Sequence, residues 1–245
     1  MSHTDPIKAQ LSQYFALPAT TNVCQDCGVP AVGFSRCDPC NTRQQTGLPR
    51  ADSITMLAWA IRGTQGYRDM FAYKNDPPDR GALARVKRLF QQSLTDHTAC
   101  IIPRTLPPIF FSWVPSTQPT VTTTEHPLRE ILQSTFAKPQ FTVADYVGPR
   151  NPKPNARRGF HPERWKVSTH LNGACIYLFD DSWVTGGHAQ SVASALKNAG
   201  AREVHFIAIA RIINNKFHKN YLANNPPKPY DPAVCPTHKI NHHSQ

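Results

Sequence analysis

The stretch 174-ACIYLFDDSWVTGGHA-189 decides the fold expected for this chain. Residues 174–181 form a near-continuous apolar run that ends in two carboxylates, which is typical of a parallel strand buried on both faces. The apolar residues that follow have the i, i+3, i+4, i+7 spacing of a helix, and Gly200 stands where that helix would end: Ala189, Val192, Ala193 and Leu196. A second apolar run at 204–213 predicts another strand. Together they predict a right-handed βαβ unit and an α/β fold with a central, mainly parallel sheet flanked by helices.

Other segments extend this pattern on both sides. Helical spacing of apolar residues predicts helices over 54–61, 83–94 and 126–136. The run 109-IFFSWVP-115 predicts a buried strand that ends in a loop. Residues 148–164 are rich in Pro, Gly and Arg, which predicts a mobile basic loop.

The chemistry of the deciding stretch indicates a sugar phosphate. Asp180 and Asp181 would project from the carboxyl end of a strand, where open α/β sheets bind ligands. Carboxylates accept hydrogen bonds and therefore suit ribose hydroxyls. The loop 182–187 would turn backbone N–H groups toward a phosphate at the start of the next helix, and Gly186 and Gly187 would let the chain come close.

Four cysteines near the start predict a metal site. Cys24, Cys27, Cys37 and Cys40 form two C-x2-C pairs separated by nine residues, and four thiolates can surround one zinc ion tetrahedrally. Such a closed site is structural rather than catalytic. A disulfide or incidental cysteines are the alternative. We expect a zinc-binding segment at 1–50 and a main domain with an extended tail at 51–245.

Composition limits the class of protein. The chain has 245 residues and 27 Lys and Arg against 16 Asp and Glu, a formal net charge of +11. This surplus favours polyanionic partners such as pyrophosphates or nucleic acid, although it also serves solubility. No apolar run is long enough to span a bilayer and the first residues lack a signal-peptide pattern. We therefore expect a cytoplasmic protein with no membrane partner and with reduced cysteines.

The acids, the Thr-Gly loop and the helix resemble the pyrophosphate-sugar signature of type I phosphoribosyltransferases. This resemblance implies that fold, with a small hood over the sheet, and transfer of a phosphoribosyl group from phosphoribosyl pyrophosphate with Mg2+ to a nucleobase or amine. It implies catalytic roles for Asp180 and Asp181. The residues that it implies for substrate binding in the loop are Ser182, Trp183, Val184, Thr185, Gly186, Gly187 and His188.

With the two cysteine pairs and the VP strand end, most of the chain is similar in order to the ComF-type competence proteins. This similarity implies a zinc-bearing phosphoribosyltransferase homologue. It also implies pyrophosphate contacts at Ser116 and Thr117, after the VP strand end. The basic loop with Arg157 and Arg158 could instead close on pyrophosphate, and its Arg side chains would stabilise the leaving charge.

Several alternatives stay open. Val184 and His188 depart from the family pattern, which keeps a binding module without turnover in view, either a nucleotide sensor or a DNA-binding protein. Trp183 could cover a ligand or pack in the core. Cys100 and Cys175 are expected in the core, whereas Cys235 with His238, His242 and His243 offers a weaker pattern for a second metal site. A homodimer is compatible with the sequence.

Overall fold

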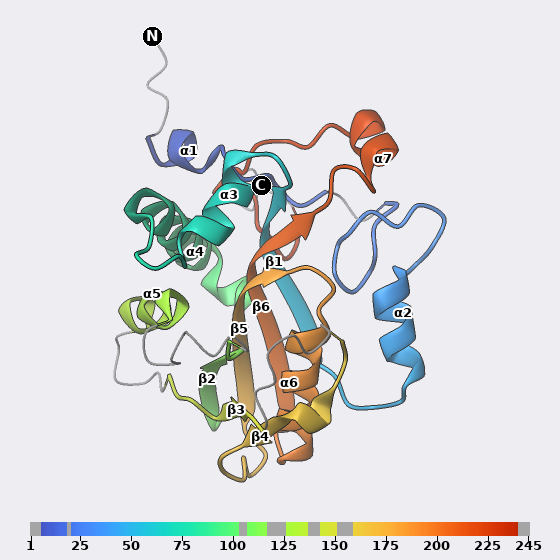
Figure 1. Ribbon diagram of the computed structural model, residues 1–245, viewed down its shortest axis with the longest axis vertical. Helices are drawn as coiled ribbons and strands as arrows, with labels where there is room; N and C mark the ends of the chain where they lie inside the picture. Colours follow the sequence, from blue (N-terminus) through green and yellow to red (C-terminus); the bar gives the residue numbers. More distant parts are fainter. Residues whose placement is uncertain are drawn as a thin grey trace. The chain divides into compact units, whose positions relative to one another are not determined.

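The computed structural model describes residues 6–18, 21–102, 107–116, 126–136, 143–150 and 159–239 (Figure 1). The chain forms two compact units. The first comprises Met1–Cys37, Thr55–Pro103 and Ala208–Gln245, and the second comprises Asp38–Ile54 and Arg104–Ile207. The chain therefore passes from one unit to the other several times.

The sheet has four strands in the order β1-β6-β5-β2. They are β1 (Ser53–Ile61), β2 (Ile109–Trp113), β5 (Cys175–Trp183) and β6 (Glu203–Ile213). Strands β2 and β5 are parallel, with register from Ile109 opposite Cys175 to Trp113 opposite Phe179. Near the two ends of β1, Asp52 N donates to Val204 O and Arg62 N donates to Ile213 O, so β1 and β6 run the same way. The predicted mainly parallel sheet is confirmed, while the phosphoribosyltransferase fold itself stays a prediction.

The second unit contains residues 174–189, the stretch from which the fold was predicted. Helix α6 (Gly187–Asn198) connects β5 to β6 and completes the predicted strand-helix-strand unit. Besides β5, α6 packs against a short 3-10 helix, η1 (Pro162–Arg164), and against β4 (Trp165–Val167). Strand β4 pairs with β3 (Val147–Pro149) in a separate antiparallel ribbon. Helices α2 (Asp38–Gln45) and α5 (Pro127–Thr135) complete the unit, and α5 and β2 confirm the elements predicted over 126–136 and 109–115.

The first unit is mainly helical around its share of the sheet. It contains α1 (Pro6–Leu11), α3 (Gln65–Ala72), α4 (Arg80–Ile101) and α7 (Lys219–Asn224). Helices α3 and α4 lie side by side (Figure 1). Asp79 caps α4 by accepting a hydrogen bond from Ala82 N, as a short polar side chain does at a helix start. Helix α4 contains the predicted 83–94 segment.

The prediction of a helix over 54–61 was wrong, because this segment is strand β1. Its residues are buried continuously from Met56 to the end of the strand. A strand covered on both faces is apolar at nearly every position, so helical spacing can always be found within it. Periodicity alone therefore could not distinguish the two structures.

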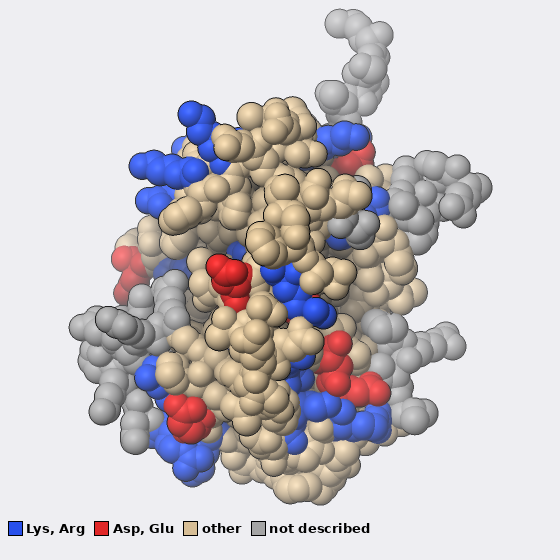
Figure 2. Space-filling model, turned by 90° about the vertical axis from the view of Figure 1, so that its right-hand side faces the viewer, with Lys and Arg blue, Asp and Glu red and all other residues tan. Residues whose placement is uncertain are grey.

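The expected basic loop is in part regular. Strand β3 lies at its start and η1 at its end, while residues 151–158 lie outside the described residues. None of the helices in the described ranges has the length and apolar character needed to cross a bilayer. On the face drawn in Figure 2, Lys and Arg occur in separate groups with Asp and Glu between them. The charge surplus is thus not gathered into one continuous patch among the described residues of that face.

Candidate functional site

Strand β5 runs two residues further than the sequence predicted and ends at Trp183. In this last part of the strand exposure alternates, with Asp180 and Ser182 half-buried and Asp181 and Trp183 buried. Successive side chains of a strand point to opposite faces. The two acids therefore lie on opposite faces of β5, and Asp180 is the one with solvent access.

Local hydrogen bonds hold the two acids at the strand end. Asp180 Oδ1 accepts a bond from the backbone N–H of Asp181 at 2.8 Å. Asp181 is only 5% exposed, and its Oδ1 accepts a bond from Ser182 Oγ at 2.8 Å. The Asp181 carboxylate thus positions the start of the turn, whereas the Asp180 carboxylate is the better placed to meet a ligand.

The turn after β5 rests on Trp183. The Trp183 side chain is 1% exposed and its ring lies 5.1 Å from that of Phe206, so the indole packs in the core. Gly186 has a φ of 77°, and a Cβ added there would lie 2.0 Å from Trp183 Cζ2. The ring therefore forms a floor beneath the turn, while Val184 and Thr185 stay exposed above it.

A second backbone segment crosses the first turn of α6. A Cβ on Gly187 would lie 2.7 Å from the carbonyl oxygen of Gly159. Ser191 holds this crossing in place, since its Oγ accepts a bond from His161 N at 2.7 Å and donates to Gly187 O at 2.6 Å. The ring of His188 lies edge-on to Trp165 at 5.9 Å. Packing alone therefore requires glycine at 186 and 187, whether or not an anion binds there.

The loop after β2 lies at the same sheet edge as the end of β5. Val114 N donates a hydrogen bond to Phe179 O at 2.8 Å, directly after the last register pair of the two strands. The half-buried Ser116 follows two residues later. The structure therefore brings the predicted Ser116 and Asp180 segments to one edge, whereas Thr117, Arg157 and Arg158 lie outside the described residues.

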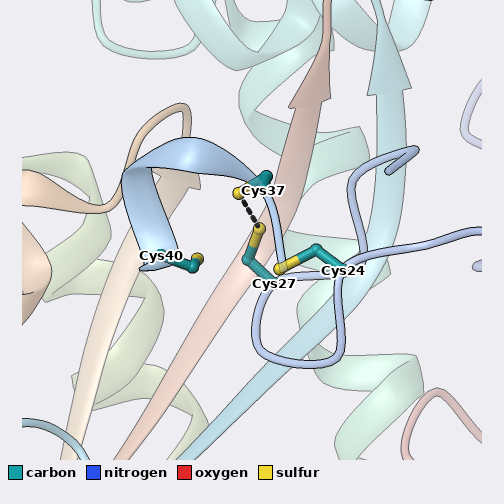
Figure 3. Close-up of side chains that lie close together, drawn as sticks. All are labelled: Cys24, Cys27, Cys37 and Cys40. Atoms are coloured by element: carbon teal, nitrogen blue, oxygen red, sulfur yellow. Dashed lines mark hydrogen bonds between the residues drawn. The ribbon is translucent and has the colours of Figure 1, made fainter. Parts of the chain in front are cut away.

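The four cysteines form a close cluster (Figure 3). All four Sγ atoms lie within 4.8 Å of one another, and those of Cys27 and Cys37 are 3.7 Å apart. The first pair lies in a tight turn in which Gly28 has a φ of 68° and donates its N–H to Cys24 O. Cys37 directly precedes α2 and Cys40 lies in its first turn, where the helix dipole stabilises a thiolate.

This donor set fits a tetrahedral metal ion. Metal–sulfur distances of about 2.3 Å in a tetrahedron place the sulfur atoms about 3.8 Å apart, close to the Cys27–Cys37 separation. Three of the four cysteines are buried, and Arg43 Nη2 donates to Cys40 Sγ at 3.3 Å. The predicted grouping is confirmed as a site that could hold a structural metal ion, and zinc stays a prediction.

The structure shows two features that the sequence did not predict. Arg43 is 6% exposed, and besides its bond to Cys40 its guanidinium lies 5.8 Å from the centre of the Trp183 ring. It therefore connects the cysteine cluster to the floor of the β5–α6 turn, and no local pattern marks it. Cys100 joins Cys235 and His238 in a second group of metal-binding side chains, while His242 and His243 lie outside the described residues.

No protein-family model matches the chain, and no curated protein matches its sequence. The resemblance to phosphoribosyltransferases therefore stays a prediction from the residues quoted in the sequence analysis.

Proposed function

We propose that this protein is a phosphoribosyltransferase-like protein that binds phosphoribosyl pyrophosphate at the carboxyl edge of β2 and β5. The supporting observation is the pairing of these two parallel strands, because it brings the Ser116 segment, Asp180 and the start of α6 to one edge. Open parallel sheets bind ligands at this edge. The resemblance to ComF-type proteins points to the same chemistry.

In this proposal Asp180 accepts hydrogen bonds from the ribose hydroxyls. The first N–H groups of the 12-residue helix α6 and the exposed Thr185 hydroxyl bind the 5-phosphate, since a helix start combines unpaired donors with a favourable dipole. The buried Asp181 holds the turn through Ser182. Mg2+ would neutralise part of the pyrophosphate charge. Transfer then replaces the bond from the anomeric carbon to pyrophosphate by a bond to the acceptor.

We further propose that the four-cysteine cluster holds Zn2+ as a structural ion. Four thiolates form a closed coordination shell with no position for a substrate. Through Arg43 and Trp183 this centre supports the turn from below. Loss of the metal should therefore weaken ligand binding in addition to unfolding the N-terminal segment.

The binding step is tested by calorimetric titration of the full chain with phosphoribosyl pyrophosphate and Mg2+. We expect saturable binding that Asp180→Asn weakens about tenfold or more. Asp76→Asn should leave the affinity unchanged, because Asp76 is an exposed acid that is not part of the proposed site. Unchanged affinity in Asp180→Asn would refute the site. Pyrophosphate release with a panel of nucleobases and amines then tests turnover.

A nucleotide-binding role without turnover is the second candidate. The burial of Asp181 favours it, because a buried carboxylate is poorly placed to take part in the transfer step. The Gly159 backbone, which crosses the first turn of α6, also restricts the space there. Saturable binding with no pyrophosphate release from any acceptor would support this candidate. A DNA-binding role instead predicts an affinity that falls steeply with salt and that does not change in Asp180→Asn.

A further inference from the structure

The segment after β6 returns to the last turn of α4 and brings a second set of soft metal ligands together in the first unit. Cys100 lies in that last turn, and Cys235 and His238 form a C-x2-H pair. Their ligand atoms all lie within 4.8 Å of one another. Cys235 is fully buried, and His238 is exposed at the rim.

The distances suit a tetrahedral ion. Cys235 Sγ and His238 Nδ1 are 3.6 Å apart. Metal–sulfur and metal–nitrogen distances of about 2.3 and 2.0–2.1 Å at a tetrahedral angle give a separation of about 3.6 Å. The group thus has the spacing of two ligands on one ion, with Nδ1 as the metal-binding nitrogen of His238.

Neighbouring contacts hold these ligands in place. Helix α4 is interrupted at His97, which has non-helical dihedral angles, and this interruption sets the direction of the turn that carries Cys100. The His97 ring hydrogen-bonds to Pro232 O at 2.8 Å, and Tyr230 OH hydrogen-bonds to Ser93 Oγ at 2.7 Å. After Cys235, Thr237 Oγ1 donates a hydrogen bond to Cys100 O at 3.5 Å. The segment 230–239 is therefore docked on α4 before and after Cys235, and little ordering remains to be done when an ion binds.

We propose that Cys100, Cys235 and His238 form a second metal site, for Zn2+ or a similar thiolate-binding ion, that clamps the segment 230–239 onto α4. Two thiolates and one imidazole are a ligand set that such ions prefer. The set has three members among the described residues, and water completes the tetrahedron. The site lies within one unit and is independent of the phosphoribosyl site.

The test uses elemental mass spectrometry to measure the metal content of the full chain. The protein is purified without chelator and reloaded with Zn2+ before the measurement. We expect two ions per chain in the wild type, and one in His238→Ala and in Cys235→Ser. We also expect one ion in Cys27→Ser, which removes the other site. His170→Ala serves as the matched control, because it changes another exposed histidine and should keep both ions. His238→Ala alters an exposed side chain and should fold even where Cys235→Ser does not.

Three results would overturn the proposal. The first is a single ion in the wild type that Cys27→Ser removes completely. The second is two ions retained in His238→Ala and Cys235→Ser alike. The third is a disulfide between Cys100 and Cys235, which would leave five free thiols instead of the seven expected from the sequence when the chain is denatured without reductant.

Discussion

Replacement of Gly186 by alanine tests whether the turn rests on Trp183. At a φ of 77° a non-glycine residue costs about 1–2 kcal/mol. The added Cβ would also lie 2.0 Å from the indole, which contacts Phe206 and Arg43 and has little room to move. Overpacking of this kind costs about 1–3 kcal/mol more. We expect Gly186→Ala to lower the free energy of unfolding by about 2–5 kcal/mol in total.

Gly47→Ala is the matched control, since Gly47 has a φ of 67° and no atom within 4 Å of an added Cβ. It should show the backbone cost alone. Urea unfolding of the two variants should therefore differ by about 1–3 kcal/mol, and the melting temperatures by about 2–12 °C. Repeating Gly186→Ala in a Trp183→Ala background should remove this difference, because the cycle isolates the contact between the two residues.

Equal destabilisation by Gly186→Ala and Gly47→Ala would refute this packing. If Gly186→Ala were no less stable than Gly47→Ala but lost phosphoribosyl pyrophosphate binding, glycine at 186 would serve ligand approach alone. Stability and binding measured on the same samples therefore separate the two explanations.

The remaining predictions concern three other contacts. Asp69→Ala should lower the free energy of unfolding by about 3–5 kcal/mol, measured in urea, because the fully buried carboxylate accepts two 2.7 Å bonds from Arg85; a loss below 1 kcal/mol would contradict it. Arg43→Met should weaken metal binding about 10- to 100-fold in chelator competition through loss of the bond to Cys40, and unchanged affinity would count against that contact. Burial raises the pKa of Tyr230 from its ordinary value of 10.0 to about 12. The unfolded chain loses this proton at lower pH than the folded chain does. The contribution of Tyr230 to the free energy of unfolding is therefore complete below pH 10 and is lost between pH 10 and about 12, by up to about 3 kcal/mol. Tyr230→Phe should flatten that part of the curve of stability against pH, and an identical slope would argue against the shift.

The elements predicted correctly are those whose signals are local. They are the helix after Gly186, the strand predicted within 109–115 and the grouping of the four cysteines. Each follows from spacing over a few residues, because a turn of helix or a C-x2-C pair brings such residues together without help from the rest of the chain. The prediction for 54–61 was wrong because it also depended on local spacing alone. Burial on both faces removes the periodicity that distinguishes a strand from a helix.

The sequence by itself determined that two apolar strands flank a helix along the chain and that two cysteine pairs can meet at one ion. Both features depend on residues that are close together in the sequence. Only the tertiary structure decided that β5 continues to Trp183, that the indole lies beneath Gly186, and that Cys100 meets Cys235 and His238. These outcomes depend on which distant segments pack against one another. Such packing is set by the burial of the whole chain, which a local pattern does not contain.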